Sequence, residues 1–318
     1  MSLRAVERVF AQGSSFMSEP RHRDRPLLAI GLVLASTVFL SCSDVTAKYL
    51  ASSVPAIEIA WLRYVVFLLI LLPAILHARP RRMLRSNRPG LQVFRALALV
   101  TSSILFISSL RFLPIAEATA TSFAAPLFIT ALSIPFLGEK VGPRRWAATI
   151  VGLAGVLVVV RPGTSAFQPA SILPMMAALS WASAVVVTRQ TSAMDTALTT
   201  LSYSAMIGVL VLTALLPLVW TFPDWHTIGF GVLIGCAATA GHWLIVIAFR
   251  YGDASVLAPF TYTQLVWSTG LGVIVFGAIP DVWTITGATV IVLSGLYTAH
   301  RERIRSHEKA LNRAGSLR

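Results

Sequence analysis

The sequence predicts an all-α integral membrane protein of ten transmembrane helices, arranged as two inverted five-helix repeats. Composition is the first observation, because 56% of the residues are hydrophobic and only 12% are charged, whereas a soluble domain has about 25% charged residues. The second is a series of ten apolar stretches, each close to the ~20 residues that cross a ~30 Å hydrocarbon core. The third is a similarity between the two halves of the chain.

The apolar stretches follow one another with short links. Prolines inside them do not exclude helices, because neighbouring helices in a membrane re-satisfy the carbonyl groups that proline leaves free. We expect the first repeat in residues 27–163 and the second in 164–299, between an N-terminal tail, 1–26, and a basic C-terminal tail, 300–318. The predicted spans are 27–49, 56–77, 91–112, 115–138, 145–162, 168–189, 197–220, 228–249, 254–277 and 281–299.

A constant offset relates the two halves. Arg111 and Arg250 are 139 positions apart, and so are Gly138 and Gly277. One register that holds in several regions favours an internal duplication. Because each copy has an odd number of helices, the second copy must enter the membrane from the opposite face, as in many secondary transporters.

Basic residues are concentrated in the loops on one side and in the tails. The net charge of +13 would favour nucleic-acid binding in a soluble protein, but this distribution favours membrane orientation instead, and no nucleic-acid partner is expected. Only Arg111 and Arg161 fall in the opposite loops. The positive-inside rule then predicts cytoplasmic N- and C-termini. We expect a multi-pass protein of the inner (cytoplasmic) membrane, surrounded by the lipid bilayer.

Charged side chains in the first two spans are candidate substrate-binding groups. A charge at the bilayer centre costs at least ~2.5–3.5 kcal/mol, so each one needs a partner or a role. Asp44 and Lys48 share one helix face, and Arg63 falls at a similar depth in the next span. One interpretation is a structural Asp44–Arg63 ion pair, with Lys48 and Glu58 nearby. In the other, Arg63 or Lys48 binds an anionic substrate group and Asp44 takes a coupling proton.

Aromatic and amide side chains in the second repeat extend the set of substrate-binding candidates. Trp181, Tyr262 and Trp267 lie deep in their spans, where they can stack a flat substrate. Gln264 can supply hydrogen bonds to that substrate. Histidine changes charge near neutral pH, so His242 is a candidate proton relay or, more simply, a hydrogen-bonded core residue. Ordinary helix packing explains each aromatic residue equally well.

The sequence lacks the motifs of several functional classes. The sequence contains no GxxxxGK[ST], HExxH or GxSxG pattern, so it does not predict an ATPase, a zinc protease or a serine hydrolase. Cys42 and Cys236 lie in apolar runs without a CxxC spacing, and we expect no metal, cofactor or catalytic residue. A membrane enzyme acting on lipids and a non-transporting scaffold are less favoured alternatives.

Several segments together resemble a known family. The strongest is PLFITALSIPFLGEKVGPRRWAATIVGLAGVLVVVRPG, residues 126–163, with an LGE turn and an RPG exit. LSCSDVTAKYL and PAIEIAWLRYVVFLLILLPAIL fit the start of the first unit, and ALSWASAVVVTRQ fits the start of the second. On these segments, residues 40–162 and 179–297 resemble the paired EamA-type units of the drug/metabolite transporter (DMT) superfamily. The glutamate of the LGE turn, Glu139, is not repeated in the second unit, and we interpret it as structural or gating.

The resemblance implies a secondary transporter that moves a small organic metabolite without ATP hydrolysis. Its substrate site would lie near the midplane between the inverted repeats, and transport would follow alternating access. The charged cluster and the deep aromatic residues favour an amino acid or a similar zwitterionic or aromatic compound. The alternatives are a planar vitamin such as riboflavin, a nucleobase-like compound and broad-specificity drug export. Protons or a counter-substrate are candidate coupling partners, and the sequence does not encode the direction of transport.

Overall fold

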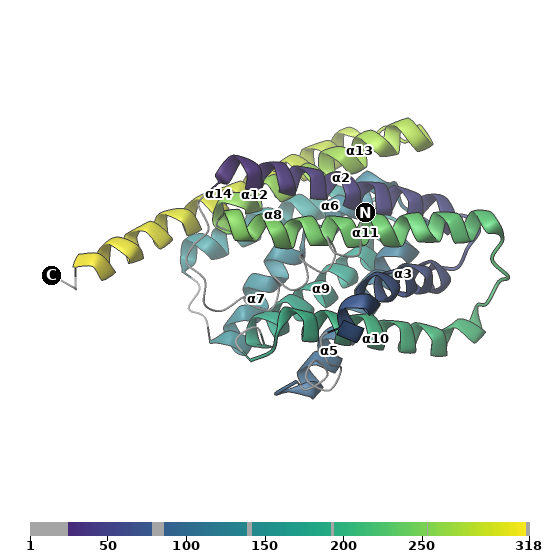
Figure 1. The fold of residues 1–318 in the computed structure, drawn as a ribbon. Coiled ribbons are helices and arrows are strands. Elements are labelled where there is room, and N and C mark those ends of the chain that lie inside the picture. Colours follow the sequence, from purple (N-terminus) through teal and green to yellow (C-terminus); the bar gives the residue numbers. More distant parts are fainter. Residues whose placement is uncertain (1–24, 78–85, 139–141, 192–193, 253, 316–318) are drawn as a thin grey trace.

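The computed structural model describes residues 25–77, 86–138, 142–191, 194–252 and 254–315. Every regular element in these ranges is helical, and most of the helices lie side by side along one direction (Figure 1). The elements in chain order are α2 (Pro26–Ala51), α3 (Ala56–His77), α5 (Pro89–Leu110), α6 (Ile115–Ser122), α7 (Ala125–Leu137), α8 (Pro143–Val160), the 3-10 turn η1 (Pro169–Ser171), α9 (Ile172–Thr191), α10 (Ala197–Leu215), the 3-10 turn η2 (Leu216–Leu218), α11 (Trp225–Tyr251), α12 (Ala254–Thr261), α13 (Thr263–Phe276) and α14 (Val282–Gly315).

These helices fill the ten predicted spans. In the described residues, seven helical stretches are long and apolar enough to cross a membrane, and the apolar parts of α8 and α14 are shorter. The pair α6 and α7 forms one span, and the pair α12 and α13 forms another. The prediction of an all-helical membrane fold built from two five-helix repeats is therefore confirmed.

Helix starts follow the local sequence. The helices α2, α5 and α8 have proline in their first turn, where its missing N–H removes no intrahelical hydrogen bond. The side chain of Thr196 accepts a hydrogen bond from the N–H of Thr199 at the start of α10. At the start of α11, the side chain of Asp224 accepts a hydrogen bond from the N–H of Thr227 in the same way. Such caps satisfy N–H groups that have no partner within the helix.

Repeat-related positions have the same local structure. Gly138 and Gly277 end α7 and α13 with φ angles of 66° and 64°, a left-handed conformation that glycine adopts without steric strain. Phe123 lies at the break between α6 and α7, and Tyr262, 139 positions later, lies at the break between α12 and α13. Their rings stack with centroids 4.9 Å apart. The two broken helices therefore meet at equivalent positions, as a duplicated chain predicts.

The helices form two groups and one further pair, α8 with α14, which also packs on α6 and α12. In one group, α11 packs along α2 and α3, and α2 also packs on α13; in the other, α9 packs on α5 and α7. Helix α10 packs on both α3 and α5 and so connects the groups, while α8 packs along α14. At the α8–α14 crossing, a Cβ added to Gly155 would lie 2.9 Å from the carbonyl oxygen of Gly287. The backbones of this pair are thus in close contact.

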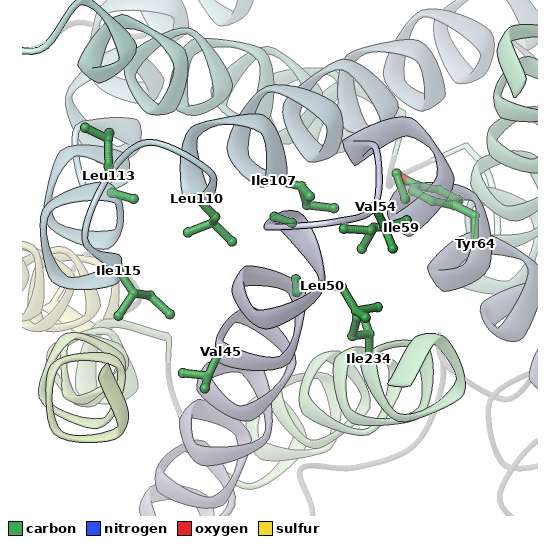
Figure 2. Close-up of a cluster of buried hydrophobic side chains, with 14 of the residues drawn as sticks. Val45, Leu50, Val54, Ile59, Tyr64, Ile107, Leu110, Leu113, Ile115 and Ile234 are labelled. Atoms are coloured by element: carbon green, nitrogen blue, oxygen red, sulfur yellow. The ribbon is translucent and has the colours of Figure 1, made fainter. Parts of the chain in front are cut away.

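The largest buried cluster lies where α2, α3, α5 and α11 meet. Figure 2 shows its side chains converging from these helices. Each of four representative members is at most 4% exposed. These members are Leu50, Ile59, Ile107 and Ile234.

Small residues bring α3 close to α10 and α11. A Cβ added to Gly231 or Gly235 of α11 would lie within 2.6 Å of an α3 side chain. A Cβ added to Gly208 of α10 would lie 2.2 Å from the ring of Tyr64. Because lipid tails are as apolar as the helices, such close contacts stabilise helix association in a membrane.

The two ends of the bundle are distinct. We call the end at which α2 begins and α14 projects beyond its neighbours the tail end, and the opposite end the far end (Figure 1). The C-terminal region differs from expectation, because α14 continues as a helix to Gly315 beyond the predicted span 281–299. Most of the predicted N-terminal tail, and Glu139, lie outside the described residues.

Candidate functional site

Asp44 lies where α2 meets α13. It is only 8% exposed, and its Oδ2 accepts a hydrogen bond from Nε2 of Gln264 at 3.2 Å. Gln264 is the second residue of α13, and the N-terminal end of a helix favours a nearby anion. One turn earlier on α2, the hydroxyls of Ser41 and Ser268 are hydrogen-bonded at 3.0 Å. The start of α13 therefore helps to hold the Asp44 carboxylate inside the bundle.

Arg63 faces the same region from α3. It lies within electrostatic range of Asp44, Tyr64 and His242. The direct ion pair between Arg63 and Asp44 that one interpretation predicted is not formed. Among the described residues, the half-buried guanidinium of Arg63 has no hydrogen-bonding or ion-pair partner. This leaves its donors available to a ligand.

Lys48 has structural partners instead. Its Nζ donates hydrogen bonds to the carbonyl oxygens of Leu110 at 2.9 Å and Leu113 at 2.6 Å, and it lies 5.5 Å from the ring centre of Phe276. The C-terminal end of a helix attracts a cation, so this contact stabilises the junction of α2 with the end of α5. The structure does not bring the Lys48 ammonium into contact with Asp44.

Glu58 also has a structural contact. It is fully buried in the first turn of α3, and its Oε2 accepts hydrogen bonds from the hydroxyl and the N–H of Thr221 at 2.7 and 3.2 Å. Thr221 belongs to the link between η2 and α11. Glu58 thus fixes that link at the far end, and it is not part of the region around Asp44.

Trp181 and His242 approach each other from different helix groups. Trp181 belongs to α9 and His242 to α11, and their ring centroids are 6.1 Å apart. Nδ1 of His242 lies 2.8 Å from the carbonyl oxygen of Ala238. Because a carbonyl oxygen only accepts, Nδ1 carries a proton, and Nε2 of the neutral ring is an acceptor. Both side chains are exposed, so both present surface that a ligand can contact.

Tyr262 and Trp267 occupy different places. Tyr262 stacks on Phe123 and lies so close to Gly295 that a Cβ there would overlap its hydroxyl, which makes it a packing residue at the helix break. Trp267 is 43% exposed, and it has no ring contact or hydrogen bond to a described residue. The structure thus brings together five of the eight predicted residues: Asp44, Arg63, Trp181, His242 and Gln264.

Sequence reasoning missed a polar network at the tail end. The carboxylate of Asp195, in the link between α9 and α10, accepts hydrogen bonds from Oγ of Ser86 at 2.5 Å, N of Asn87 at 3.0 Å and Nε2 of Gln92 at 2.8 Å. Burial raises the pKa of Asp195, but these hydrogen bonds outweigh that effect and lower it below 3.8. We call these four residues the tail-end latch. No periodic signal links its two segments, which lie more than one hundred positions apart.

Arg95 is another polar residue whose contacts were not predicted from the sequence. Its Nε donates to Oγ1 of Thr188 at 2.6 Å, and its Nη1 donates to Oγ of Ser204 at 2.5 Å. These contacts join α5 to α9 and α10. Unlike Arg63, therefore, Arg95 has its donors satisfied within the protein.

The fold defines a class, the multi-pass membrane proteins that are built from two helical repeats. The profile of the EamA-like transporter family matches residues 27–161 and, a second time, residues 168–299. The chain belongs to the EamA-like transporter family.

Similar proteins are transporters of small molecules. The chain is 29% identical to an S-adenosylmethionine uptake transporter of Rickettsia felis, over 89% of this chain and 97% of that one. It is 29% identical to a riboflavin transporter of Vibrio cholerae, over 88% and 95% of the two chains. It is 26% identical to a pseudopaline exporter of Pseudomonas aeruginosa, over 82% and 92%. A crystal structure at 21% identity matches 86% of the chain with a TM-score of 0.62, which shows a shared fold.

Proposed function

We propose that the protein is a secondary transporter of the inner membrane that moves S-adenosylmethionine, or a metabolite of closely similar chemistry, by alternating access. Such a metabolite combines an amino-acid group, a sulfonium cation and an adenine ring. The observation that carries the proposal is the guanidinium of Arg63, which has no partner among the described residues and lies near Asp44, His242 and Tyr64. Both termini would lie in the cytoplasm.

The two charges provide complementary contacts for the amino-acid end. A cation without a partner in a membrane interior is unfavourable, and a substrate carboxylate bound to Arg63 relieves that cost with a charge-assisted hydrogen bond. Asp44 can then attract the ammonium or the sulfonium group. Because Gln264 and the start of α13 already stabilise the Asp44 carboxylate, Asp44 does not need Arg63 as its partner.

The aromatic pair suits the ring of the same substrate. Trp181 exposes 39% of its surface, and an indole face stacks well on a flat heterocycle. Nε2 of His242 can accept a hydrogen bond from an exocyclic amine, because Nδ1 is bound to the Ala238 carbonyl. Relatives named as S-adenosylmethionine uptake transporters support the same substrate for this chain.

Riboflavin is the second candidate. It offers a flat ring for Trp181 but no carboxylate for Arg63, and riboflavin transporters are among the relatives. Loss of the Arg63 charge therefore distinguishes the two. A zwitterionic substrate needs the guanidinium, whereas a neutral flat vitamin depends mainly on the aromatic surface.

The deciding experiment is uptake of labelled S-adenosylmethionine into proteoliposomes, with methionine, adenosine and riboflavin as competitors. Arg63→Ala should weaken substrate binding by roughly 2–5 kcal/mol, the range for truncating one partner of a bound charge pair, and so reduce uptake at least tenfold. Arg111→Ala, at an exposed far-end position, is the matched control and should transport normally. Uptake of riboflavin alone, unchanged by Arg63→Ala, would replace the first candidate by the second.

A further inference from the structure

A polar cavity lies at the far end of the bundle. Its volume is about 190 Å³. It lies between the start of α6, the residue that follows α8 and the residues around the start of α14. Its polar lining consists of Glu117, Arg161, Gln168, Asp281 and Thr284. None of these residues belongs to the cluster around Arg63.

Glu117 supplies a buried negative charge to this cavity. It lies in the first turn of α6 and is only 8% exposed. Its Oε1 accepts a hydrogen bond from Oγ of Ser171 at 2.9 Å. Its second oxygen has no hydrogen-bond partner among the described residues, and Glu117 lines the cavity. A ligand that donates a hydrogen bond to this oxygen would be stabilised there.

Arg161 supplies a positive charge to the cavity, and its backbone has an unusual conformation. It is the one described residue other than glycine with a positive φ, 51°, a conformation that side chains with a Cβ adopt at a steric cost. Its Nη1 forms an ion pair with Oδ2 of Asp281 at 2.7 Å. Its Nε is buried and has no hydrogen-bond partner within the described chain. Strain of this kind is often found where a binding site fixes a side chain.

The geometry points to a far-end binding site for the α-amino-acid group of the transported metabolite, with its ammonium on Glu117 and its carboxylate on Arg161. This inference rests on the proposed function, because it concerns the same substrate. The cavity is smaller than the ~300–1,000 Å³ of pockets that enclose drug-sized ligands, so it suits the amino-acid end alone. No group of three His, Cys, Asp or Glu side chains in the described residues is arranged for a metal ion, which favours an organic ligand.

The cavity lies near the central break of the same helix. Glu117 precedes Phe123 by six residues, about 9 Å along a helix. The lining holds two carboxylates and one guanidinium. Because Asp281 already pairs with Arg161, the carboxylate of Glu117 is the one left for the ammonium group of the ligand. The far-end site would therefore bind the amino-acid end of the substrate before, or after, the substrate occupies the site at Arg63.

Binding of L-methionine to purified protein tests this inference. We expect Arg63→Ala protein to retain saturable L-methionine binding by calorimetry, and the double variant Arg63→Ala with Glu117→Gln to bind at least tenfold more weakly. Glutamine keeps an oxygen for Ser171, so folding should persist. Asp224→Asn is the matched control, because it removes a carboxylate at the same end that caps α11 and does not line the cavity.

The outcomes separate this inference from the proposed function. If methionine binding to Arg63→Ala protein is absent, or unchanged by Glu117→Gln, the far-end site is wrong even when S-adenosylmethionine is transported. If methionine binding depends on Glu117 but S-adenosylmethionine is not transported, the far-end site stands and the proposed function fails. Should Glu117→Gln not fold, Arg161→Lys keeps the charge but shifts it, and methionine binding unaffected by that change would overturn the inference.

Discussion

At the scale of single residues, Arg63 and Lys48 illustrate two environments of a cation in a membrane. Both lie in the first two spans, but Lys48 donates to two carbonyl oxygens at the end of α5. Arg63 has no such acceptor within the described chain. A cation whose donors are satisfied stabilises the frame, whereas one without acceptors is available for a charged substrate. The difference lies in the surroundings and not in the residue type.

The surroundings also explain why the sequence indicated candidate site residues but not which of them have partners within the protein. Asp44, Arg63, Trp181, His242 and Gln264 were predicted because polar and large aromatic residues are unusual inside apolar spans. The acceptors of Lys48 were not predicted, since they are carbonyl groups 62 and 65 positions away. A backbone carbonyl has no sequence signature, so only tertiary structure shows which charge it satisfies.

Trp181 and Trp267 provide a paired test of ring binding. Replacing Trp181 by alanine should weaken an adenine-containing substrate by roughly 1–3 kcal/mol, the range for loss of one base–aromatic stack. Trp267→Ala should have a smaller effect, because the contact with His242 is made by Trp181. Competition of labelled uptake by adenosine and by methionine separates the ring from the amino-acid end. Equal losses for both competitors in the Trp181 variant would indicate helix packing instead.

Asp195 makes the tail-end latch sensitive to acid. Burial raises its pKa, but hydrogen bonds led by that from Ser86 lower it below the ordinary value of 3.8. A carboxyl group with a lowered folded-state pKa stabilises the fold above its unfolded value and loses that contribution as pH falls through the folded value. Thermal unfolding should therefore show wild type losing more stability than Asp195→Asn below about pH 4. Parallel profiles for the two proteins would contradict this role.

At the scale of whole helices, the sequence indicated the spans better than their interruptions. The predicted spans 115–138 and 254–277 were continuous, but the structure divides each of them, near Phe123 and Tyr262. Pro126 and Pro259 lie close to the breaks. Proline alone does not predict a break in a membrane helix, because neighbouring helices satisfy the freed carbonyls. Here the two interruptions meet through stacked rings, a contact between repeats that no local pattern shows.

The contact between α3 and α10 depends on a glycine. A Cβ at Gly208 would lie 2.2 Å from the ring of Tyr64, so Gly208→Ala should destabilise the protein by about 1–3 kcal/mol, as overpacking of a core does. Gly229→Ala in α11 is the matched control, because nothing lies within 4 Å of its added Cβ. Melting temperatures in detergent should fall for the first variant and not for the second. A normal melting temperature for Gly208→Ala would show that α10 moves away without loss.

At the scale of the whole molecule, the membrane makes the architecture predictable. Every backbone polar group in the hydrocarbon core must be satisfied internally, so long apolar runs must form helices. Hydropathy therefore indicated all ten spans, and the constant offset between the two halves of the chain indicated the two repeats. How the helices pack was not predicted, since lipid-facing and protein-facing surfaces are both apolar. Close pairs such as α8 with α14, and α2 with α11, come from the structure alone.

The predicted orientation places the far end outside the cytoplasm. Phe222, in the link before α11, is 93% exposed at that end, and Arg88 is exposed at the tail end. In a background with both natural cysteines replaced, Phe222→Cys should react with a membrane-impermeant thiol reagent applied to intact spheroplasts. Arg88→Cys should react only after the membrane is opened. The reverse pattern would invert the topology.

The long final helix offers a route to experimental imaging. Helix α14 has 34 residues, about 51 Å at a rise of 1.5 Å per residue, which is well beyond a ~30 Å hydrocarbon core. Its last turns would therefore stand clear of a detergent micelle as a straight extension. A soluble partner joined through uninterrupted helix would be held in a fixed direction, giving a 34.3 kDa membrane protein a rigid marker for particle alignment in electron cryomicroscopy.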